Sequence, residues 1–447
     1  MTPDQARAWI AGLEILGMRF GLERIHALLA ALGDPQRHAP ALHVVGTNGK
    51  SSTTRLAAAA LASRGGRVGA YLSPHVTDWS ERVQIGGAPL SPEGLAEAAT
   101  AVRAAAEGLD LEEGDRVTQF EALTAIAFWS FRAHDVDAVA VEAGLGGRFD
   151  ATNVLPPSTA VVLTNISLEH TQFLGDTEAA IAAEKLAVAP DGADRLVLGP
   201  LSAAARAAVD DICAARGLRP VRYGEDLVAR DTPGGVEVVT PRARYEGLPL
   251  GLRGAFQREN LAVALAAAEM VAGGPLDVAP LREAVARVEV PGRLELFAGR
   301  PDVVIDGAHN PAGMRALADA LPEVVAGRGP VTAVVSVLGD KRALEMVEAL
   351  GGVVDLVFTT RSSHARAVDA VELAGLAGDV GVPAWAVDDP AAALAEARAA
   401  AGPDGVVVVA GSLYLLADLR AALVAEGMGT PATLAPARKG TDPPEAN

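Results

Sequence analysis

The sequence has almost no cysteine, and its charge is mostly of one sign. Cys213 is the single cysteine among 447 residues. This excludes an internal disulfide and a multi-cysteine zinc site, and it favours a cytoplasmic location. Lysine and arginine number 38 against 56 aspartates and glutamates, a net charge of −18. An acidic surface repels phosphate backbones, so we expect no nucleic-acid partner.

Long apolar runs are absent from the sequence, and we expect no secretory leader. The first residues, MTPDQARAWIAGLEIL, lack the basic and apolar regions of a secretory signal. The apolar run 406–416 is interrupted by Gly411, Ser412 and Tyr414, and it is shorter than the ~20 residues that cross a bilayer. We therefore expect no membrane partner.

Most of the chain alternates short β-branched runs with helical stretches, over a length that favours two domains. The first strands that we expect are LHVV, VGAYL, DAVAVE, TAVVLTNI and RLVLG. Helices are expected between them, at 51–64, 91–106 and 120–133. This alternation predicts an α/β fold, with a mostly parallel sheet covered by helices on both faces.

A second alternating set follows PGRLELF, with expected strands DVVID, VTAVVSVL, VDLVFTT and GVVVVAG. Pro291 and Gly292 interrupt the preceding helical pattern. We therefore expect a first domain at 1–293 and a smaller, Rossmann-like α/β domain at 294–427. Residues 428–447 contain four prolines and no periodicity, which predicts a disordered tail.

A phosphate-binding loop is predicted where the strand LHVV is followed by GTNGKSSTT and a helix. Gly46 and Gly49 let backbone amides approach an anion, and Lys50 begins the helix. The strict Walker pattern fails, because Val44 stands where its first glycine belongs. A plain glycine turn is the alternative, but the strand–loop–helix context favours phosphate binding.

Other polar residues, taken alone, have structural explanations beside functional ones. Glu142 ends an apolar strand, at the sheet edge where ligands bind; it suits magnesium or a strand-end cap equally well. His170 is more typical of a loop histidine, because magnesium prefers oxygen. Lys185 fits a solvated helix lysine, and Gln257 and Asn260 fit polar residues at a helix start.

The GTNGKSS segment resembles the ATP-binding loop of the Mur ligase superfamily. Further segments resemble its folate branch, the dihydrofolate synthase/folylpolyglutamate synthase family, and cover essentially residues 12–420. They are FGLERIHALLAALGDP, YLSPHVTDWSERVQI, TQFEALTAIAF, VEAGLGGRFDATNVL, LEHTQFLGDT, AAEKLAV, GAFQRENLAVAL, PGRLE, DGAHNPAGM and GSLYLL.

The resemblance implies ATP and magnesium as cofactors and assigns their binding residues. The implied nucleotide contacts are Thr47, Asn48, Gly49, Lys50, Ser51, Ser52, Asn260, Arg293, Asp306 and His309. The implied magnesium ligands are Ser73, Glu142, His170 and Lys185, the lysine after carboxylation by carbon dioxide; Lys50, Glu142, His170 and Lys185 are the implied catalytic set. Three places differ from the family pattern. Glu169 stands where the family usually has aspartate, and Phe256 stands where it often has histidine. Leu-Ala-Val follows Lys185 where the family tends to have Ala-Gly-Ile.

The same resemblance assigns the acceptor, dihydropteroate, to two segments. The implied contacts are Thr118, Gln119, Phe120, Glu121, Phe149, Asp150 and Ala151. Phe120 would stack on the pterin, and Asp150 would bind its amino-pyrimidine edge. The spacing of Thr118 and Glu121 also predicts a capping box, which can coexist with that role.

The implied reaction joins L-glutamate to dihydropteroate and to the glutamate tails of tetrahydrofolate, through an acyl phosphate, in folate biosynthesis and one-carbon metabolism. We expect a monomer that acts on these small molecules. A ligase that only extends folate tails, a cell-wall precursor ligase and a nucleotide-driven ATPase switch are the alternatives. A nicotinamide dehydrogenase is disfavoured, because no strand leads into G-x-G-x-x-G with an acidic residue ~20 positions later.

Overall fold

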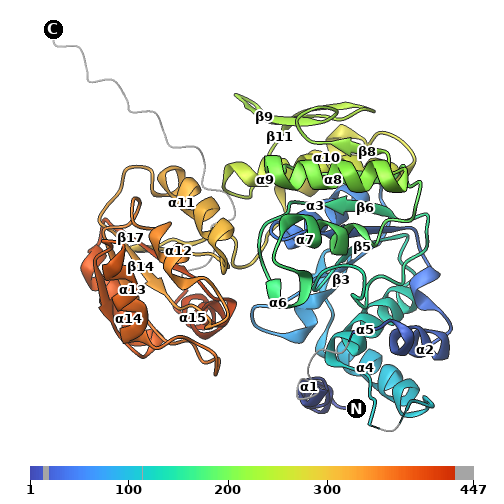
Figure 1. The fold of residues 1–447 in the computed structure, drawn as a ribbon, viewed down its shortest axis with the longest axis horizontal. Helices are drawn as coiled ribbons and strands as arrows, with labels where there is room; N and C mark the ends of the chain where they lie inside the picture. The colour runs from blue at the N-terminus through green and yellow to red at the C-terminus, as the bar shows by residue number, and fades with distance from the viewer. Residues whose placement is uncertain (14–19, 113, 428–447) are drawn as a thin grey trace. The chain divides into compact units, whose positions relative to one another are not determined.

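The chain forms two compact units in the computed structural model, which describes residues 1–13, 20–112 and 114–427. The first unit is Met1–Pro291 and the second begins at Gly292 (Figure 1). This division falls two residues before the boundary expected from the sequence, so Arg293 belongs to the second unit. The tail predicted at 428–447 lies outside the described residues.

A mostly parallel sheet is the centre of the first unit. Its strand order is β4-β3-β2-β5-β1-β6-β7-β8, with β3 and β4 antiparallel to their neighbours. The strands are β1 Ala41–Val45, β2 Val68–Tyr71, β3 Val83–Ile85, β4 Ala88–Pro89, β5 Ala138–Glu142, β6 Ala160–Leu163, β7 Leu196–Leu198 and β8 Pro220–Arg222. A small antiparallel sheet has β9 Val228–Thr232, β10 Gly235–Val239 and β11 Arg244–Leu248.

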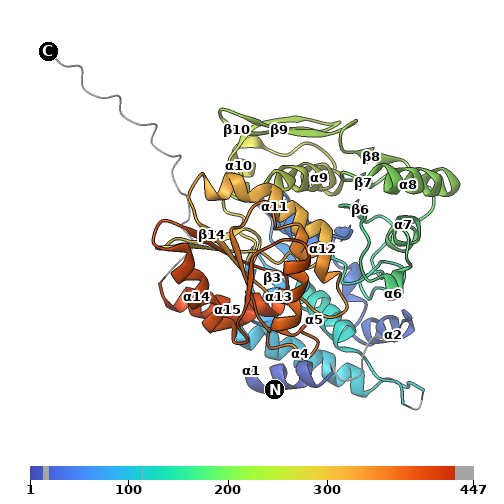
Figure 2. The same cartoon turned by 60° about the vertical axis from the view of Figure 1, so that its left-hand side comes forward.

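Helices cover both faces of this sheet, with α3 and α9 on one side and α4 and α5 on the other (Figures 1 and 2). Successive strand residues point to opposite faces; on β5, Val139 and Val141 join one core and Ala138 and Ala140 the other. The helices are α1 Pro3–Gly12, α2 Glu23–Ala31, α3 Lys50–Ala62, α4 Pro92–Glu107, α5 Gln119–Ala133, α6 Thr171–Leu174, α7 Glu178–Leu186, α8 Ala203–Arg216, α9 Ala255–Ala272 and α10 Val278–Ala286.

The second unit has a sheet of strand order β12-β13-β17-β14-β15-β16, parallel except for β12. Its strands are β12 Glu295–Phe297, β13 Asp302–Ile305, β14 Val331–Val335, β15 Leu356–Thr359, β16 Ala384–Ala386 and β17 Val406–Ala410. Its helices are α11 Pro311–Val325, α12 Ala343–Glu348, α13 Ala370–Asp379, α14 Pro390–Ala401 and α15 Leu413–Ala425. In both units the predicted α/β class is confirmed.

Strands β3, β4, β8 to β12 and β16 were not predicted from the sequence, and most of them are short or half-exposed. β9, for example, buries none of its side chains fully, so it carries no apolar run. Within the described part of the chain, no helix has the length and apolar character needed to cross a bilayer.

Candidate functional site

The predicted phosphate loop lies between β1 and α3, at the carboxyl edge of the first sheet. Gly46 and Gly49 adopt φ values of 148° and 80°, which disfavour any residue with a side chain. A Cβ at Gly46 would lie 1.8 Å from Thr164 Oγ1, and one at Gly49 would lie 2.6 Å from Asn260 Oδ1. Both glycines are therefore required by backbone conformation and by close packing.

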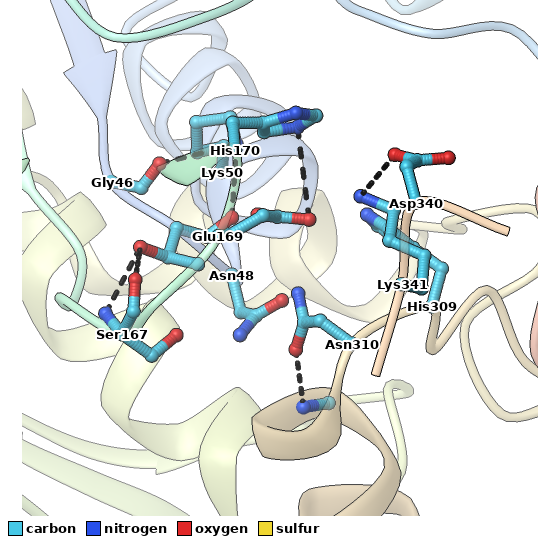
Figure 3. Close-up of polar contacts among 12 residues, drawn as sticks. Gly46, Asn48, Lys50, Ser167, Glu169, His170, His309, Asn310, Asp340 and Lys341 are labelled. Carbon is cyan, nitrogen blue, oxygen red and sulfur yellow. Dashed lines mark hydrogen bonds and ion pairs between the residues drawn. The ribbon is translucent and has the colours of Figure 1, made fainter. Parts of the chain in front are cut away.

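The loop is held by the segment that follows β6. The amide of Thr47 donates to the Asn165 carbonyl at 3.0 Å, and the amide of Asn48 to the Asn165 side chain at 2.9 Å. Lys50 Nζ donates to the carbonyls of Gly46 and Thr47, at 3.2 and 3.0 Å (Figure 3). The Lys50 side chain therefore folds back over its own loop. Its positive charge and the N-terminus of α3 both favour an anionic ligand at this place.

The Glu142 carboxylate connects the ends of three neighbouring strands by hydrogen bonds. Glu142 is the last residue of β5 and is 1% exposed. Its Oε1 accepts a hydrogen bond from the Ser51 hydroxyl at 2.9 Å, and its Oε2 accepts one from the backbone amide of Ser73 at 3.1 Å. Since β2, β5 and β1 are adjacent, the fold brings together two predicted magnesium ligands and a loop serine. Ser52, the next residue, is buried.

Lys185 is buried rather than solvated, which corrects the structural alternative considered from the sequence. It lies near the end of α7, is 5% exposed, and donates from Nζ to the Gly46 carbonyl at 2.7 Å. Burial, followed by the charge of Lys50, lowers the pKa of its amine to about 7, although Glu169 and Asp150 oppose that shift. A substantial neutral fraction at pH 7 makes the amine nucleophilic.

His170 is the N-cap residue of the short helix α6 and adopts a left-handed conformation, with φ 52°. Its Nε2 lies 3.8 Å from Oε1 of the buried Glu169 (Figure 3). Among the described residues, no three His, Cys, Asp or Glu side chains form a group that could hold a metal ion. The carboxylate and hydroxyl oxygens at Glu142 still fit magnesium, because this ion typically binds one or two carboxylates and completes its shell with water and phosphate oxygens.

Two buried polar atoms beside the phosphate loop have no hydrogen-bond partner among the described residues: Ser167 Oγ and Gln257 Nε2. Ser167 exchanges backbone hydrogen bonds with Thr47 Oγ1, at 3.1 and 3.2 Å. Gln257, fully buried, accepts from Asn260 Nδ2 at 3.0 Å. Buried polar groups are normally paired, so these two atoms fit a polar ligand that binds at the loop.

The predicted capping box is confirmed at the start of α5. Thr118 Oγ1 accepts from the Glu121 amide at 3.3 Å, and the Thr118 amide donates to Glu121 Oε2 at 2.7 Å. Glu121 also pairs with Arg24 at 3.1 Å, and both side chains are largely buried. Gln119 donates its side-chain amide to the Ile10 carbonyl at 2.9 Å. The polar groups of this segment are thus already used by the fold.

Phe120 and Asp150, the aromatic and the acidic residue predicted to bind the acceptor, lie close together. A Cβ at Gly144 would lie 2.4 Å from Phe120 Cζ, so the loop after β5 packs against that ring. Asp150 belongs to the same loop and is almost fully buried; it accepts from the amides of Leu145 and Thr152, at 2.8 and 3.0 Å. Burial raises the pKa of the Asp150 carboxyl, and hydrogen bonds from Thr152 and Leu145 oppose the shift.

Phe149 and Ala151 flank Asp150 and differ in exposure. Phe149 is 49% exposed, and its ring lies 6.2 Å from that of Phe20, whereas Ala151 is buried. Phe20 also lies 5.8 Å from Phe173. The exposed aromatic rings provide an apolar surface beside Asp150.

Arg293, Asp306 and His309 lie in the second unit, around the end of β13. Asp306 is buried and accepts from the amides of Leu294 and Ala308, at 2.9 and 2.8 Å. Burial raises the pKa of this carboxyl, and the charge of Arg293 opposes the shift. His309 Nδ1 lies 2.7 Å from a carbonyl two residues earlier. These contacts organise the loop, so the predicted nucleotide roles stay predictions.

Ser167 was not predicted as a site residue from the sequence. Gln257 was predicted only as a polar residue at the start of a helix. A usable signal for Ser167 exists: it closely follows β6, the strand beside β1, so a small hydroxyl residue there must lie near the phosphate loop. The unpaired Gln257 amide has no such signal, because it depends on how α9 packs against α3.

The chain is similar to known proteins over most of its length. Residues 292–413 match the family model "Mur ligase, glutamate ligase domain". The dihydrofolate synthase/folylpolyglutamate synthase of Bacillus subtilis is 32% identical, over 93% of this chain and 98% of that protein. A crystal structure of Mycobacterium tuberculosis folylpolyglutamate synthase complexed with ADP and AMPPCP has a TM-score of 0.84 and 32% identity, covering 94% and 99% of the two chains. Escherichia coli FolC in complex with DHPP and ADP has a TM-score of 0.84 and 29% identity, covering 94% and 98%.

Proposed function

Because the chain belongs to the dihydrofolate synthase/folylpolyglutamate synthase family, we propose that it is an ATP-dependent ligase that joins L-glutamate to dihydropteroate and to the glutamate tails of tetrahydrofolate. The observation that carries this proposal is the phosphate loop with Lys50 at the start of α3, beside the Glu142 carboxylate. Relatives over most of the chain length carry the same two activity names.

The reaction has two steps on the substrates. The acceptor carboxylate attacks the γ-phosphate of ATP, which forms an acyl phosphate and releases ADP. The amine of L-glutamate then attacks the acyl carbon, and phosphate leaves as the amide forms. Lys50 neutralises charge on the transferred phosphoryl oxygens, because its amine stands at the helix N-terminus where the phosphates bind. No covalent enzyme nucleophile is needed.

Glu142 and Ser51, with Ser73 and His170, would hold magnesium at the edge of the sheet. Magnesium held there would neutralise negative charge on the phosphate groups of ATP. The Ser51 hydroxyl and both Glu142 oxygens are oriented by the fold before any ligand arrives. Ser167 Oγ and Gln257 Nε2 supply further unpaired polar atoms for the nucleotide.

Lys185 is proposed to carry a carboxyl group derived from carbon dioxide, which would turn a cation into an oxygen ligand. Its burial and its position at the Gly46 carbonyl support this, since the modification requires a neutral amine close to the phosphate loop. Protein incubated with ¹³C-bicarbonate should show a carbamate carbon resonance that is absent from Lys185→Arg. An identical spectrum for both proteins would reject the modification.

The acceptor is proposed to bind against Phe120, with Asp150 facing the N–H groups of its amino-pyrimidine edge. Aromatic stacking supplies apolar contact area, and a buried carboxylate selects N–H donors. Phe149 adds an exposed ring at the same place.

Magnesium-dependent ADP release tests the function. It should be measured with L-glutamate and, in turn, dihydropteroate, tetrahydrofolate or no acceptor. Release with both acceptors is expected. Release with tetrahydrofolate alone would reduce the protein to a tail-extending ligase. Release that needs no acceptor would reject the ligase and favour an ATPase.

A further inference from the structure

A buried histidine on β1 is connected by hydrogen bonds to the acceptor carboxylate. His43 is 1% exposed, and its Nε2 lies 2.7 Å from Thr152 Oγ1. Thr152 is fully buried and donates both its backbone amide and its hydroxyl to Asp150 Oδ1. The mechanism above uses neither His43 nor Thr152.

The direction of these hydrogen bonds follows from the chemistry of a hydroxyl group. The Thr152 hydroxyl has one proton, which it donates to Asp150. Its oxygen must therefore accept the bond from His43, so the imidazole carries its proton on Nε2. Burial lowers the pKa of His43 to about 3, and the ring is neutral in the working range. A neutral donor orients the hydroxyl without adding charge beside Asp150.

The connection links two parts of the site that are far apart in sequence. His43 lies three residues before Gly46, on the strand that leads into the phosphate loop. Thr152 lies in the loop after β5, the strand that pairs with β1 next to His43. A rigid strand therefore holds the hydroxyl that orients Asp150.

We propose that His43 and Thr152 are positioning residues for the acceptor: through the Thr152 hydroxyl they hold Asp150 in the orientation that receives the N–H groups of the pterin edge. This inference rests on the proposed function. Neither residue touches the acceptor or the reacting atoms, so their loss should weaken acceptor binding and leave nucleotide binding intact.

The test compares Thr152→Val, which removes only the hydroxyl, with Thr152→Ser, which keeps it. Thr152→Val should raise the KM for dihydropteroate about 10-fold, with the KM for ATP and the kcat within twofold of wild type. Thr152→Ser should restore the acceptor KM to within twofold. Thr332→Val is the matched control: it also removes a buried threonine hydroxyl, in the second unit, and should leave the acceptor KM unchanged.

His43→Phe, which keeps a planar ring without the donor, should raise the acceptor KM as Thr152→Val does. The double variant should have an acceptor KM close to that of either single variant, because both substitutions break the same chain of hydrogen bonds. Unchanged acceptor KM in Thr152→Val, or equal rises for acceptor and ATP, would overturn the proposal. If Thr152→Val folds poorly, the proposal is tested by His43→Phe and Thr152→Ser instead. His43→Phe should then raise the acceptor KM and leave the KM for ATP unchanged, and Thr152→Ser should change neither. Failure of the proposed function would appear separately, as a wild type without turnover of dihydropteroate.

Discussion

The phosphate loop and the acceptor segment are both assigned to ligand binding, but their polar side chains serve the fold to different degrees. Among the described residues, the Lys50 amine donates hydrogen bonds to two carbonyls of its own loop. Glu121, by contrast, caps α5 and pairs with the buried Arg24. A residue implied as a ligand contact can thus also support the fold, and substitutions test the two roles separately.

The largest expected effect on stability is at Glu121, on the acceptor side of this comparison. Glu121→Ala leaves Arg24 buried without its partner and removes the cap of α5, so the free energy of unfolding should fall by about 3–5 kcal/mol. Denaturant titration measures this. Glu107→Ala, which breaks an exposed pair with Arg103, is the control and should change stability by less than about 1 kcal/mol. An unchanged stability for Glu121→Ala would contradict its structural role at α5.

Lys50→Ala should have the opposite profile. Turnover should fall by about 10²–10³-fold or more, because the loss concerns charge in the transition state. The melting temperature should stay within a few degrees, since the side chain supports only its own loop. Lys50→Arg keeps the charge but not the geometry and should recover little. Near-normal turnover in Lys50→Ala would remove the phosphate-loop assignment.

The order of these two effects could be anticipated only in part from the sequence. The capping box was predicted from the spacing of Thr118 and Glu121, because it depends on four consecutive residues. The partner Arg24 lies 97 positions away from Glu121 and has no local signal. The phosphate loop was predicted in the same local way, from glycines and a lysine between a strand and a helix.

Asp150 combines the two kinds of role. Asp150→Ala should raise the KM for dihydropteroate by roughly 10–100-fold, the value of a hydrogen bond to a charged group, and the KM for ATP by much less. It should also destabilise the loop, because the Leu145 and Thr152 amides lose their acceptor. Steady-state kinetics with each substrate varied gives both values. Equal rises in the two KM values would show that Asp150 is purely structural.

What remained hidden in the sequence depends on packing between distant elements. Lys185 lies on an alanine-rich helix whose buried face is not marked by a clear apolar stripe, so its burial was not predicted. His43 and Thr152 meet although 109 positions separate them. Most parallel strands were predicted because both faces are buried and their runs are rich in valine. The parallel strands β8 and β16, which are more exposed, were missed. The family and fold class are confirmed, and the individual site roles stay predictions.

The smallest expected effect concerns pH. The pKa of His43 is lowered from 6.5 to about 3 in the fold, so the native protein binds fewer protons than the unfolded chain between these values. Its contribution to stability is complete above pH 6.5 and is lost as the pH falls toward 3. Each pH unit below 6.5 should cost at most about 1.4 kcal/mol for this group. His43→Phe should flatten the decline measured by denaturant titration at pH 7, 6 and 5. An equally steep decline in that variant would contradict a neutral, buried His43.

The most direct measurement of the central claim follows oxygen from the acceptor to phosphate. Dihydropteroate labelled with ¹⁸O in its carboxylate should be turned over with ATP, magnesium and L-glutamate, and the phosphate analysed by mass spectrometry. Ligation through an acyl phosphate predicts one ¹⁸O atom in each phosphate released with amide formation. Unlabelled phosphate would show that ATP is cleaved by water, and it would contradict the proposed ligase mechanism.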